Sequence, residues 1–461
     1  MAAIDDLLRD LADIPTETQP QKVKRRSRDF YWYSPVLKRQ LDHVTAEAVV
    51  TPRDEAEVLR TLRAAFTHRV PVTPRGGGTG NYGQAMPLRG GIVLDLSDLT
   101  EIRVIRFGSV RVQAGRKLAD VDAATIADSR QELRLHPSTH KTGTVGGYVA
   151  GGSSGVGSIT WGLLRDRGNI LGLRVVTMEP EPRILELRGP DIQKVNHAYG
   201  TNGIITELEM PLAPAYRWLD VLLAFPAFEP ALRFADALAR EDGILRKLVT
   251  VVAAPVPHDY LFPERGVAKE ETAVLVMVAD FARDALQELI DAASARLVDE
   301  AATADILPPR LPLFEYAWNH TTLHALKHDR SVTYLQTLFP PPHHLERVLH
   351  THRHFGDEVP LHLEFARYRG EVACFGLQLV RYTSDERLAA IIAYHEQQGC
   401  PIFNPHAYTL EEGGMKRVDH AQLAFKREAD PEGLLNPGKM LGWEDPGYGQ
   451  EGGRAFLYES R

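Results

Sequence analysis

The stretch Val72-Thr-Pro-Arg-Gly-Gly-Gly-Thr-Gly-Asn81 carries four glycines among the five residues 76–80, directly after a short apolar run. Glycine adopts backbone conformations that other residues rarely reach, so such a run can turn several backbone N–H groups toward one anion. A plain surface turn between two strands needs fewer glycines. We therefore expect a loop that holds a diphosphate.

A second glycine-rich stretch extends from Gly143 to Gly157 and begins within the segment Thr142-Gly-Thr-Val-Gly-Gly147. Four hydroxyl donors flank it: Ser138, Thr139, Ser153 and Ser154. Backbone without side chains again permits close approach of a ligand. Two such surfaces in one domain indicate one extended ligand.

Strand and helix patterns alternate around both runs, and a new pattern begins after Pro214. In the first part we expect strands at 49–50, 70–72, 91–95, 109–114, 170–177, 184–187 and 203–211, and helices at 55–66 and 118–127. In the second part we expect helices at 229–241 and 283–299 and strands at 248–253 and 273–279. A domain boundary near residue 215 follows.

Two short motifs match signatures of other enzyme classes, but the residues around them do not fit those classes. Gly78-Thr-Gly-Asn-Tyr-Gly83 matches the dinucleotide fingerprint, but Pro87 and the glycines that follow prevent the helix which that fingerprint requires. Gly151-Gly-Ser-Ser-Gly155 matches the nucleophile elbow of serine hydrolases, yet it lies among too many glycines for a sharp strand-to-helix turn. Neither a classical nicotinamide fold nor a hydrolase is expected.

Composition excludes several kinds of partner. The 461 residues include 53 Lys and Arg against 61 Asp and Glu, a net charge of −8, so nucleic acid is not expected. No apolar stretch reaches the roughly 18 residues of a membrane span. Two cysteines and a start without a secretory signal predict a cytoplasmic protein. The basic and aromatic stretch 22–33 is interpreted as an arm packed on its own domain, with a surface anchor as the alternative.

Five segments, in order along the chain, resemble the FAD-binding signatures of the vanillyl-alcohol oxidase and p-cresol methylhydroxylase (PCMH) flavoprotein family. They are Val72–Gly80, Lys141–Gly147, Arg165-Asp166 with Asn169–Leu173, Gly200–Thr206 and Leu434–Lys439. The resemblance implies an α+β protein: a PCMH-type FAD-binding domain of two α+β subdomains, and an α+β cap with an antiparallel sheet. We expect an N-terminal arm over 1–38, the FAD-binding domain over 39–215, the cap or substrate domain over 216–429, and a C-terminal return to the FAD domain over 430–461.

Carried over by position, the resemblance also implies which residues contact FAD. These are Pro74, Arg75, Gly76, Gly77, Gly78, Thr79, Gly80 and Asn81 around the diphosphate; Pro137, Ser138, Thr139, Thr142, Gly143, Thr144, Gly146 and Gly147 along the ribityl chain and flavin, with Ser153 and Ser154 nearby; Ile204 and Ile205 on the adenine side; and Asn436 and Lys439 from the C-terminal return. Family members that bind FAD covalently through the first loop have a histidine after the three glycines. Thr79 stands there, so non-covalent FAD is expected.

The substrate side resembles the D-2-hydroxyacid dehydrogenase and glycolate oxidase branch more loosely. That branch carries a paired-histidine segment on a cap strand and a later Glu-His-Gly loop, which bind the substrate carboxylate, take the hydroxyl proton and in some members ligate a metal. The matching segments here are His354–Glu364, in which His362 is the second histidine, and Ile402–Tyr408. Asn404-Pro405 replaces the expected Gly-Glu, which removes one carboxylate ligand.

The residues themselves suggest roles. His362 and Glu364 alternate on one face of the strand expected over 360–366, so both can point into one cavity. His406 lies in a proline-bounded loop and can accept a proton near neutral pH, so we expect it to be the catalytic base, with His362 and Tyr408 as its partners. Substrate-binding candidates are Tyr316, Trp318, Asn319, His320, Glu364 and Arg367. No metal is expected, although a mononuclear site at His362, Glu364 and His406 stays an alternative, as does a purely structural role for each histidine.

These features predict an FAD-dependent oxidoreductase that oxidises an alcohol-type carbon, a 2-hydroxy acid first of all, by hydride transfer to flavin N5. Phenolic or benzylic alcohols and sugar hydroxyls are alternative substrates. From other classes, a flavin-binding electron-relay subunit and a non-redox role like that of the ether-lipid synthase branch stay open. No motif names the electron acceptor, which could be oxygen, a quinone or a protein, and a homodimer is also open.

Overall fold

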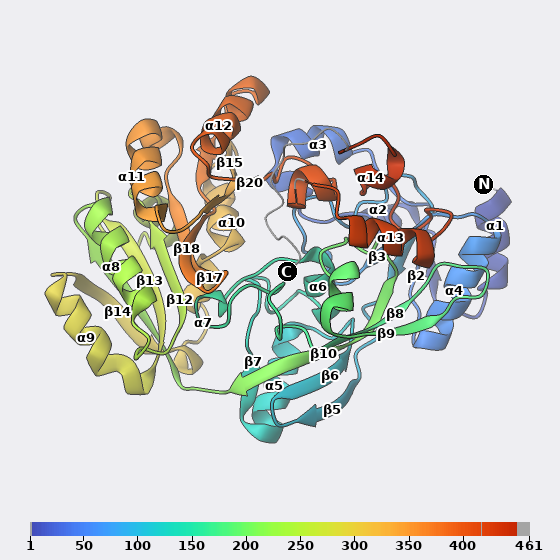
Figure 1. The fold of residues 1–461 in the computed structure, drawn as a ribbon, viewed down its shortest axis with the longest axis horizontal. Coiled ribbons are helices and arrows are strands. Elements are labelled where there is room, and N and C mark those ends of the chain that lie inside the picture. Colours follow the sequence, from blue (N-terminus) through green and yellow to red (C-terminus); the bar gives the residue numbers. More distant parts are fainter. Residues whose placement is uncertain (1, 416, 450–461) are drawn as a thin grey trace.

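The computed structural model describes residues 2–415 and 417–449. Figure 1 shows two halves joined near residue 215. The half that we call the cofactor domain contains the strands up to Pro214 and the C-terminal segment, and the half that we call the cap begins at Trp218 and contains a large sheet. Met1 and the last part of the expected C-terminal return, residues 450–461, lie outside the described residues.

A four-stranded sheet forms the first layer of the cofactor domain, in the order β1-β2-β4-β3. Its strands are β1 (Thr16–Glu17), β2 (Ala48–Val50), β3 (Val72–Arg75) and β4 (Ile92–Asp95), and β2, β4 and β3 run parallel. Helix α4 (Glu55–Thr67) connects β2 to β3 and begins at Asp54, whose side chain accepts a hydrogen bond from the Glu57 backbone. Because β3 ends at Arg75, the first glycine run starts at the carboxyl end of a parallel strand.

An antiparallel sheet forms the second layer, in the order β5-β6-β10-β8-β9, with β7 also paired to β10. Its strands are β5 (Ile102–Arg106), β6 (Ser109–Gln113), β7 (Gln131–Leu133), β8 (Gly172–Val176), β9 (Ile184–Leu187) and β10 (Ile204–Pro214), and helix α5 (Leu118–Ser129) follows β6. The second glycine-rich stretch is not all loop: it contains α6 (Val145–Gly151) and leads into α7 (Ser158–Trp161). Thr144 caps α6 by accepting from the Gly147 N–H, and Gly152 ends it with φ +69°.

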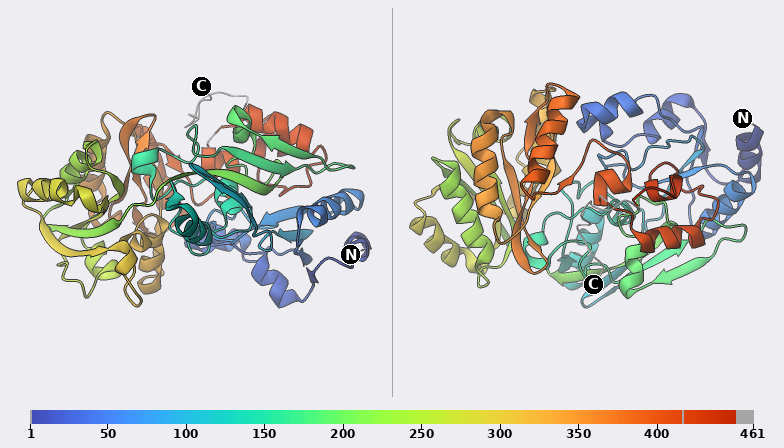
Figure 2. Two further views of the ribbon diagram at one scale, coloured as in Figure 1. Left: turned by 90° about the horizontal axis from the view of Figure 1, so that it is seen from below. Right: turned by 45° about the horizontal axis from the view of Figure 1, so that its top comes forward.

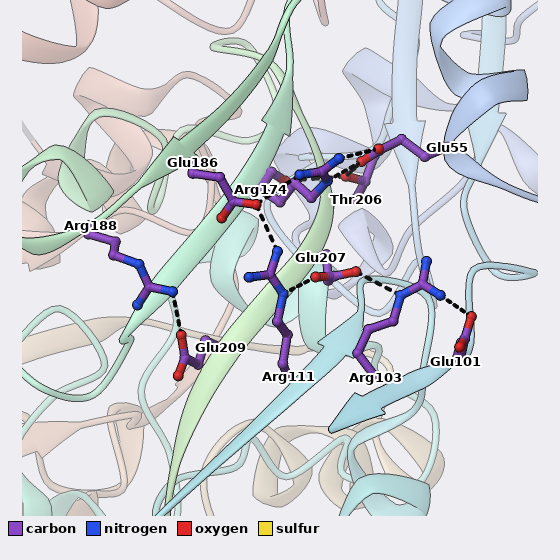
Figure 3. A network of polar contacts seen from close by, with 10 residues as sticks. All are labelled: Glu55, Glu101, Arg103, Arg111, Arg174, Glu186, Arg188, Thr206, Glu207 and Glu209. Carbon is purple, nitrogen blue, oxygen red and sulfur yellow. Dashed lines mark hydrogen bonds and ion pairs between the residues drawn. The ribbon is translucent and has the colours of Figure 1, made fainter. Parts of the chain in front are cut away.

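Ion pairs on the outer face of the second sheet connect the two layers (Figure 3). Glu207 of β10 pairs with Arg103 and Arg111 from β5 and β6. At one end of this network, Arg174 of β8 donates from both Nε and Nη2 to the Glu55 carboxylate of α4, at 2.8 Å each. This two-pronged contact fixes the layers relative to each other, and the glycine runs lie on those layers.

The cap is built on an eight-stranded antiparallel sheet in the order β14-β11-β13-β12-β17-β18-β16-β20. The strands are β11 (Trp218–Phe225), β12 (Arg246–Val252), β13 (Thr272–Ala279), β14 (Arg296–Ala302), β16 (Gln336–Phe339), β17 (His362–Tyr368), β18 (Glu371–Gly376) and β20 (Ile402–Phe403), and β15 (Val332–Tyr334) pairs separately with β19 (Leu379–Arg381). Helices α8 (Phe228–Arg240), α9 (Arg283–Ala292) and α11 (His344–Phe355) cover one face (Figure 1), and α12 (Asp385–Gln397) follows β19. The other face packs toward the cofactor domain, where Val156 and Leu163 join its core.

The helix expected over 283–299 is too long. Helix α9 ends at Ala292, Ser294 has φ +51°, and β14 begins at Arg296. The segment Arg-Leu-Val-Asp-Glu-Ala-Ala has no strong local preference for a strand, but it pairs along β11 as the edge strand of the large sheet. Tertiary pairing therefore overrides local helix propensity here.

The first part of the N-terminal arm packs on the cofactor domain (Figure 2), whereas Tyr33 near its end belongs to the core of the cap. It contains α1 (Ala2–Asp10), α2 (Pro20–Arg26), a short 3-10 helix (Tyr31–Tyr33) and α3 (Pro35–Leu41). The Phe30 N–H donates to the Gly80 carbonyl at 2.6 Å, and Arg75 donates to the Arg28 carbonyl at 2.5 Å, so the arm contacts the first glycine loop directly. No helix in residues 2–415 and 417–449 combines the length and apolar character needed to cross a bilayer.

The C-terminal segment contains α13 (His420–Ala429) and α14 (Leu441–Glu444) and lies beside the first layer. Between these helices, Leu435 forms a parallel bridge to Val72 of β3. The Val72 N–H donates to the Leu434 carbonyl and the Asn436 N–H donates to the Val72 carbonyl, each at 2.8 Å. The end of the described chain therefore supports the strand that leads into the first glycine loop.

Candidate active site

A large cavity lies where both glycine runs meet the cap, and it encloses about 1830 Å³ of empty space with its open mouth included. Most of the residues expected to contact FAD line it: Pro74, Arg75, Gly76, Gly77, Gly78, Thr79, Gly80, Asn81, Pro137, Ser138, Thr139, Gly143, Thr144, Gly146, Gly147, Ser153, Ser154, Ile204 and Ile205. The lining thus joins both glycine runs, Ile204, Ile205 and the cap around one space, as an extended ligand requires.

The two glycine runs contact each other along one side of this cavity. A Cβ added at Gly76 would lie 2.1 Å from Thr144 Oγ1, and one added at Gly77 would lie 2.3 Å from the Thr142 carbonyl oxygen. Gly78 has φ +62°, in the left-handed region that favours glycine. The absence of side chains therefore lets the runs form a continuous backbone cradle, which fits a diphosphate-containing ligand such as FAD.

Arg75 supplies a cation beneath this cradle. Its side chain is largely buried, and burial lowers the pKa of its guanidinium. Its Nε is buried without a hydrogen-bond partner within the described chain, and a Cβ on Gly78 would collide with the guanidinium. A buried cation with an unused N–H next to an anion-binding loop fits a bound diphosphate, which would compensate the lost hydration.

Three residues expected at the cofactor do not line the cavity. Thr142 points its hydroxyl to the Thr139 carbonyl. Asn436 donates to the backbone carbonyls of Gln84 (2.8 Å) and Tyr199 (2.7 Å), and Lys439 donates to the Gly83 carbonyl at 2.5 Å. These contacts stabilise the loops from outside the cavity and not from within it. Burial lowers the pKa of Lys439 to about 7.

Several lining residues were not identified from the sequence. Phe30 and Tyr33 reach the cavity from the arm, and Arg165, His197 and Tyr199 from the cofactor domain. Arg165 already belonged to a quoted motif, and extending the Gly200-Thr-Asn-Gly motif by three residues toward the N-terminus would have included Tyr199 and His197. The arm carries no comparable signal, because its contact with the Gly80 carbonyl uses backbone atoms.

The cap wall of the cavity contains three of the expected substrate residues, Trp318, Asn319 and His320. Gln336, Phe375 and Phe403 complete this wall. Tyr316 and Arg367 are not part of it: Tyr316 stacks on His324, and Arg367 donates to the exposed Asp242 at 3.0 Å. The cap wall therefore consists largely of aromatic and uncharged side chains, with His320 as a titratable exception.

His362 and Glu364 share a face of β17, as their alternation predicted, but they lie behind the cavity wall. His362 Nε2 is 2.7 Å from Glu364 Oε1, and both side chains are fully buried. Glu364 also accepts from the Thr250 hydroxyl at 2.6 Å and from the Trp318 backbone N–H at 2.6 Å. Trp318 has φ +51°, an uncommon backbone conformation for a bulky residue. The pair thus holds the strained residue that begins the cap wall.

His406 and Tyr408 do not reach the cavity. His406 Nδ1 is 2.7 Å from the Ser34 hydroxyl, and its Nε2 is 3.1 Å from the Tyr334 carbonyl, so both ring nitrogens are engaged. The Tyr408 ring lies under the Lys439 ammonium. The proline-bounded loop does hold the imidazole still, but it connects the arm to β15 instead of presenting a base to a substrate.

A pH dependence of stability follows from His406. Burial lowers its pKa to about 4, whereas an unfolded histidine has a pKa of roughly 6.5. Between these values the unfolded chain binds a proton that the folded chain excludes, so acidification lowers the free energy of unfolding by up to roughly 1.4 kcal/mol per pH unit for this group. Urea unfolding of His406→Gln between pH 7 and pH 5 should show a shallower loss than the wild type. An unchanged slope would contradict this.

Comparisons with known proteins agree with an FAD-binding role for this cavity. Residues 46–187 match the FAD binding domain family. The chain is 31% identical to D-lactate dehydrogenase of Archaeoglobus fulgidus over 243 residues, covering 50% of this chain and 53% of that protein. It is 29% identical to glycolate oxidase subunit GlcD of Bacillus subtilis over 186 residues, or 39% of each chain. The matches thus span about half, or less, of the length of these curated relatives.

Among solved structures, alkyldihydroxyacetonephosphate synthase superposes with a TM-score of 0.72, at 15% identity, covering 94% of this chain and 85% of that one. This likeness concerns the fold, an α+β arrangement of the two layers and the cap. The family match over residues 46–187 lies within the cofactor domain, where the glycine cradle lies. Residues 46–187 thus match an FAD binding domain, and over half or less of its length the chain is similar to a D-lactate dehydrogenase and a glycolate oxidase subunit.

Proposed function

We propose that the protein is an FAD-linked oxidoreductase that oxidises a hydroxyl-bearing carbon of a small molecule, with 2-hydroxy acids as the first substrate class. The observation that carries this proposal is the shared cavity: the glycine cradle and the cap wall at Trp318, Asn319 and His320 open into the same space. The names of the relatives, D-lactate dehydrogenase and glycolate oxidase, support the substrate class.

The position of each lining residue indicates its role. FAD, when bound, supplies the hydride acceptor. The backbone N–H groups of residues 76–80 and the Arg75 guanidinium bind its negative charge, and Phe375 and Phe403 exclude water from the cap side. Asn319 and Gln336 offer hydrogen bonds that can orient a substrate.

A second substrate class is favoured by the character of the cap wall. The described cap residues that line the cavity include three aromatic rings but no arginine or lysine, and Arg367 is paired with Asp242 instead. A carboxylate is usually bound by a forked guanidinium. Phenolic or benzylic alcohols would use the aromatic wall without needing that cation.

The decisive experiment is anaerobic mixing of the FAD-loaded protein with D- and L-2-hydroxy acids, benzylic alcohols and sugars while flavin absorbance is followed. Bleaching by a hydroxy acid supports the first class, and bleaching by benzylic alcohols alone supports the second. Failure of every alcohol to bleach the flavin, with reduction only by a partner protein or dithionite, would indicate an electron-relay subunit.

We also propose that FAD is held without a covalent bond. Thr79 occupies the loop position at which covalent family members carry a histidine, and a threonine hydroxyl does not form that linkage. Acid precipitation should therefore leave a yellow supernatant and a colourless pellet. A fluorescent band that stays with the protein in denaturing electrophoresis would show the opposite.

A further inference from the structure

We propose that Nε2 of His320 accepts the hydroxyl proton of the substrate, and that Glu315 is the positioning residue for this ring. The proposal rests on the function proposed above. His320 lies in the first turn of α10 (Asn319–His328) and lines the cavity next to Trp318. It is the histidine of the cap wall, so among the histidines of the cap it meets the first requirement of a base, access to the substrate.

Glu315 sets the orientation of the ring. It belongs to the short 3-10 helix Leu313–Tyr316, and its Oε2 lies 3.0 Å from His320 Nδ1. A neutral imidazole that donates its Nδ1 proton to a carboxylate carries a lone pair at Nε2. No partner for Nε2 occurs within the described residues, so this nitrogen is available on the cavity side. The same carboxylate stabilises the imidazolium that forms when Nε2 takes a proton.

Lys141 holds Glu315 in place from the cofactor domain. Its Nζ lies 2.9 Å from Glu315 Oε1, so the two carboxylate oxygens serve one residue from each domain. Burial alone would raise the pKa of Glu315, but the hydrogen bonds from His320 and Lys141 outweigh it and lower that pKa to about 2. The carboxylate is therefore ionised at any working pH. Because Lys141 directly precedes the second glycine run, the cofactor loop and the proposed base share one support.

Other charged groups near His320 do not replace it. On its own helix, His324 places Nε2 3.1 Å from the Glu315 carbonyl, and burial lowers its pKa to about 4. His197 lines the cavity, but burial lowers its pKa to about 3, too low for a base at neutral pH. His362 uses its Nε2 on Glu364, as described above. Glu315 contacts the ring directly, Lys141 pairs with that carboxylate, and His324 interacts electrostatically with His320.

The proposed step concerns the proton of the substrate. The O–H bond breaks, its proton forms a bond to His320 Nε2, and the electron pair left on oxygen becomes the second bond of the carbonyl. The hydrogen of the neighbouring C–H bond departs with its electron pair for the bound flavin, so the alcohol is oxidised and the flavin reduced. The imidazolium returns its proton to solvent at the cavity mouth before the next turnover.

The test compares His320→Gln and Glu315→Gln with His328→Gln, an exposed histidine at the end of the same helix. His320→Gln should slow flavin reduction by roughly 10²–10⁴-fold and abolish the acidic limb of its pH profile. Glu315→Gln should slow flavin reduction by a smaller factor and weaken the preference of the ring for the Nδ1–H tautomer, because the carboxylate that accepts the Nδ1 proton is lost. His328→Gln should match the wild type.

Two further measurements separate chemistry from structure. FAD content and unfolding temperature of His320→Gln should stay near wild type, and ¹⁵N NMR of histidine-labelled protein should show the Nδ1–H tautomer of His320 in the wild type and its loss in Glu315→Gln. The base assignment fails if His320→Gln reduces its flavin at the wild-type rate, and the positioning role of Glu315 fails if Glu315→Gln leaves the tautomer unchanged. If no alcohol reduces the wild-type flavin, the proposed function fails, while the ¹⁵N NMR measurement still tests the Glu315–His320 pair.

Discussion

Gly77→Asp is expected to yield protein that is largely free of FAD. Any Cβ at this position would lie 2.3 Å from the Thr142 carbonyl oxygen and 3.3 Å from the Gly143 Cα, both backbone atoms that cannot move aside cheaply. Overpacking of this kind costs roughly 1–3 kcal/mol, which is about ten- to a hundredfold in affinity. The carboxylate adds repulsion toward the diphosphate. The ratio of flavin to protein absorbance in the purified variant measures the effect.

Two variants separate the causes of this loss. Gly77→Ala keeps the steric conflict and removes the charge, so it should bind FAD better than Gly77→Asp but less well than the wild type. Gly243→Ala is the matched control, because nothing lies within 4 Å of a Cβ there and the position is remote from the cavity. Normal flavin occupancy in Gly77→Asp would mean that the diphosphate lies elsewhere.

Glu364→Ala should lower the free energy of unfolding by several kcal/mol, since each buried donor left without an acceptor costs about 1–3 kcal/mol. The side chain is 1% exposed and accepts from His362, the Thr250 hydroxyl and the Trp318 backbone N–H. The Thr250 hydroxyl and the Trp318 N–H would lose this acceptor, and His362 would keep only a contact of 3.3 Å to the Thr321 hydroxyl at Nε2. Because Trp318 begins the cap wall, the variant should also weaken substrate binding. Urea unfolding followed by tryptophan fluorescence measures the first effect.

Arg367→Ala is the matched control on the same strand. Arg367 pairs with Asp242, whose side chain is 90% exposed, and such surface pairs contribute about 0–1 kcal/mol. The two variants thus compare a buried and an exposed charge on opposite faces of β17. Equal losses of stability in both would show that Glu364 is not the acceptor that holds this region together.

The glycine loops were readable from the sequence because their requirement is local. Gly78 has φ +62°, and the backbone around it must approach an anion closely. Both requirements favour glycine whatever residues surround the loop. The same holds for the face shared by His362 and Glu364, since alternation along a strand is a property of the backbone. Both features could therefore be predicted from the sequence without knowledge of any tertiary contact.

The choice among the histidines was made by tertiary structure alone. No feature of the sequence separates His406 from His320 as a candidate base. In the structure, His406 contacts Ser34 and the Tyr334 carbonyl, whereas His320 contacts Glu315 and lines the cavity. Likewise, the segment 296–302 became a strand through pairing with β11. A side chain's partners come from segments distant in the chain, so its burial and free nitrogen are set by packing. The sequence by itself predicted the glycine cradle, because that requirement is local, and only the folded chain decided which imidazole faces the cavity.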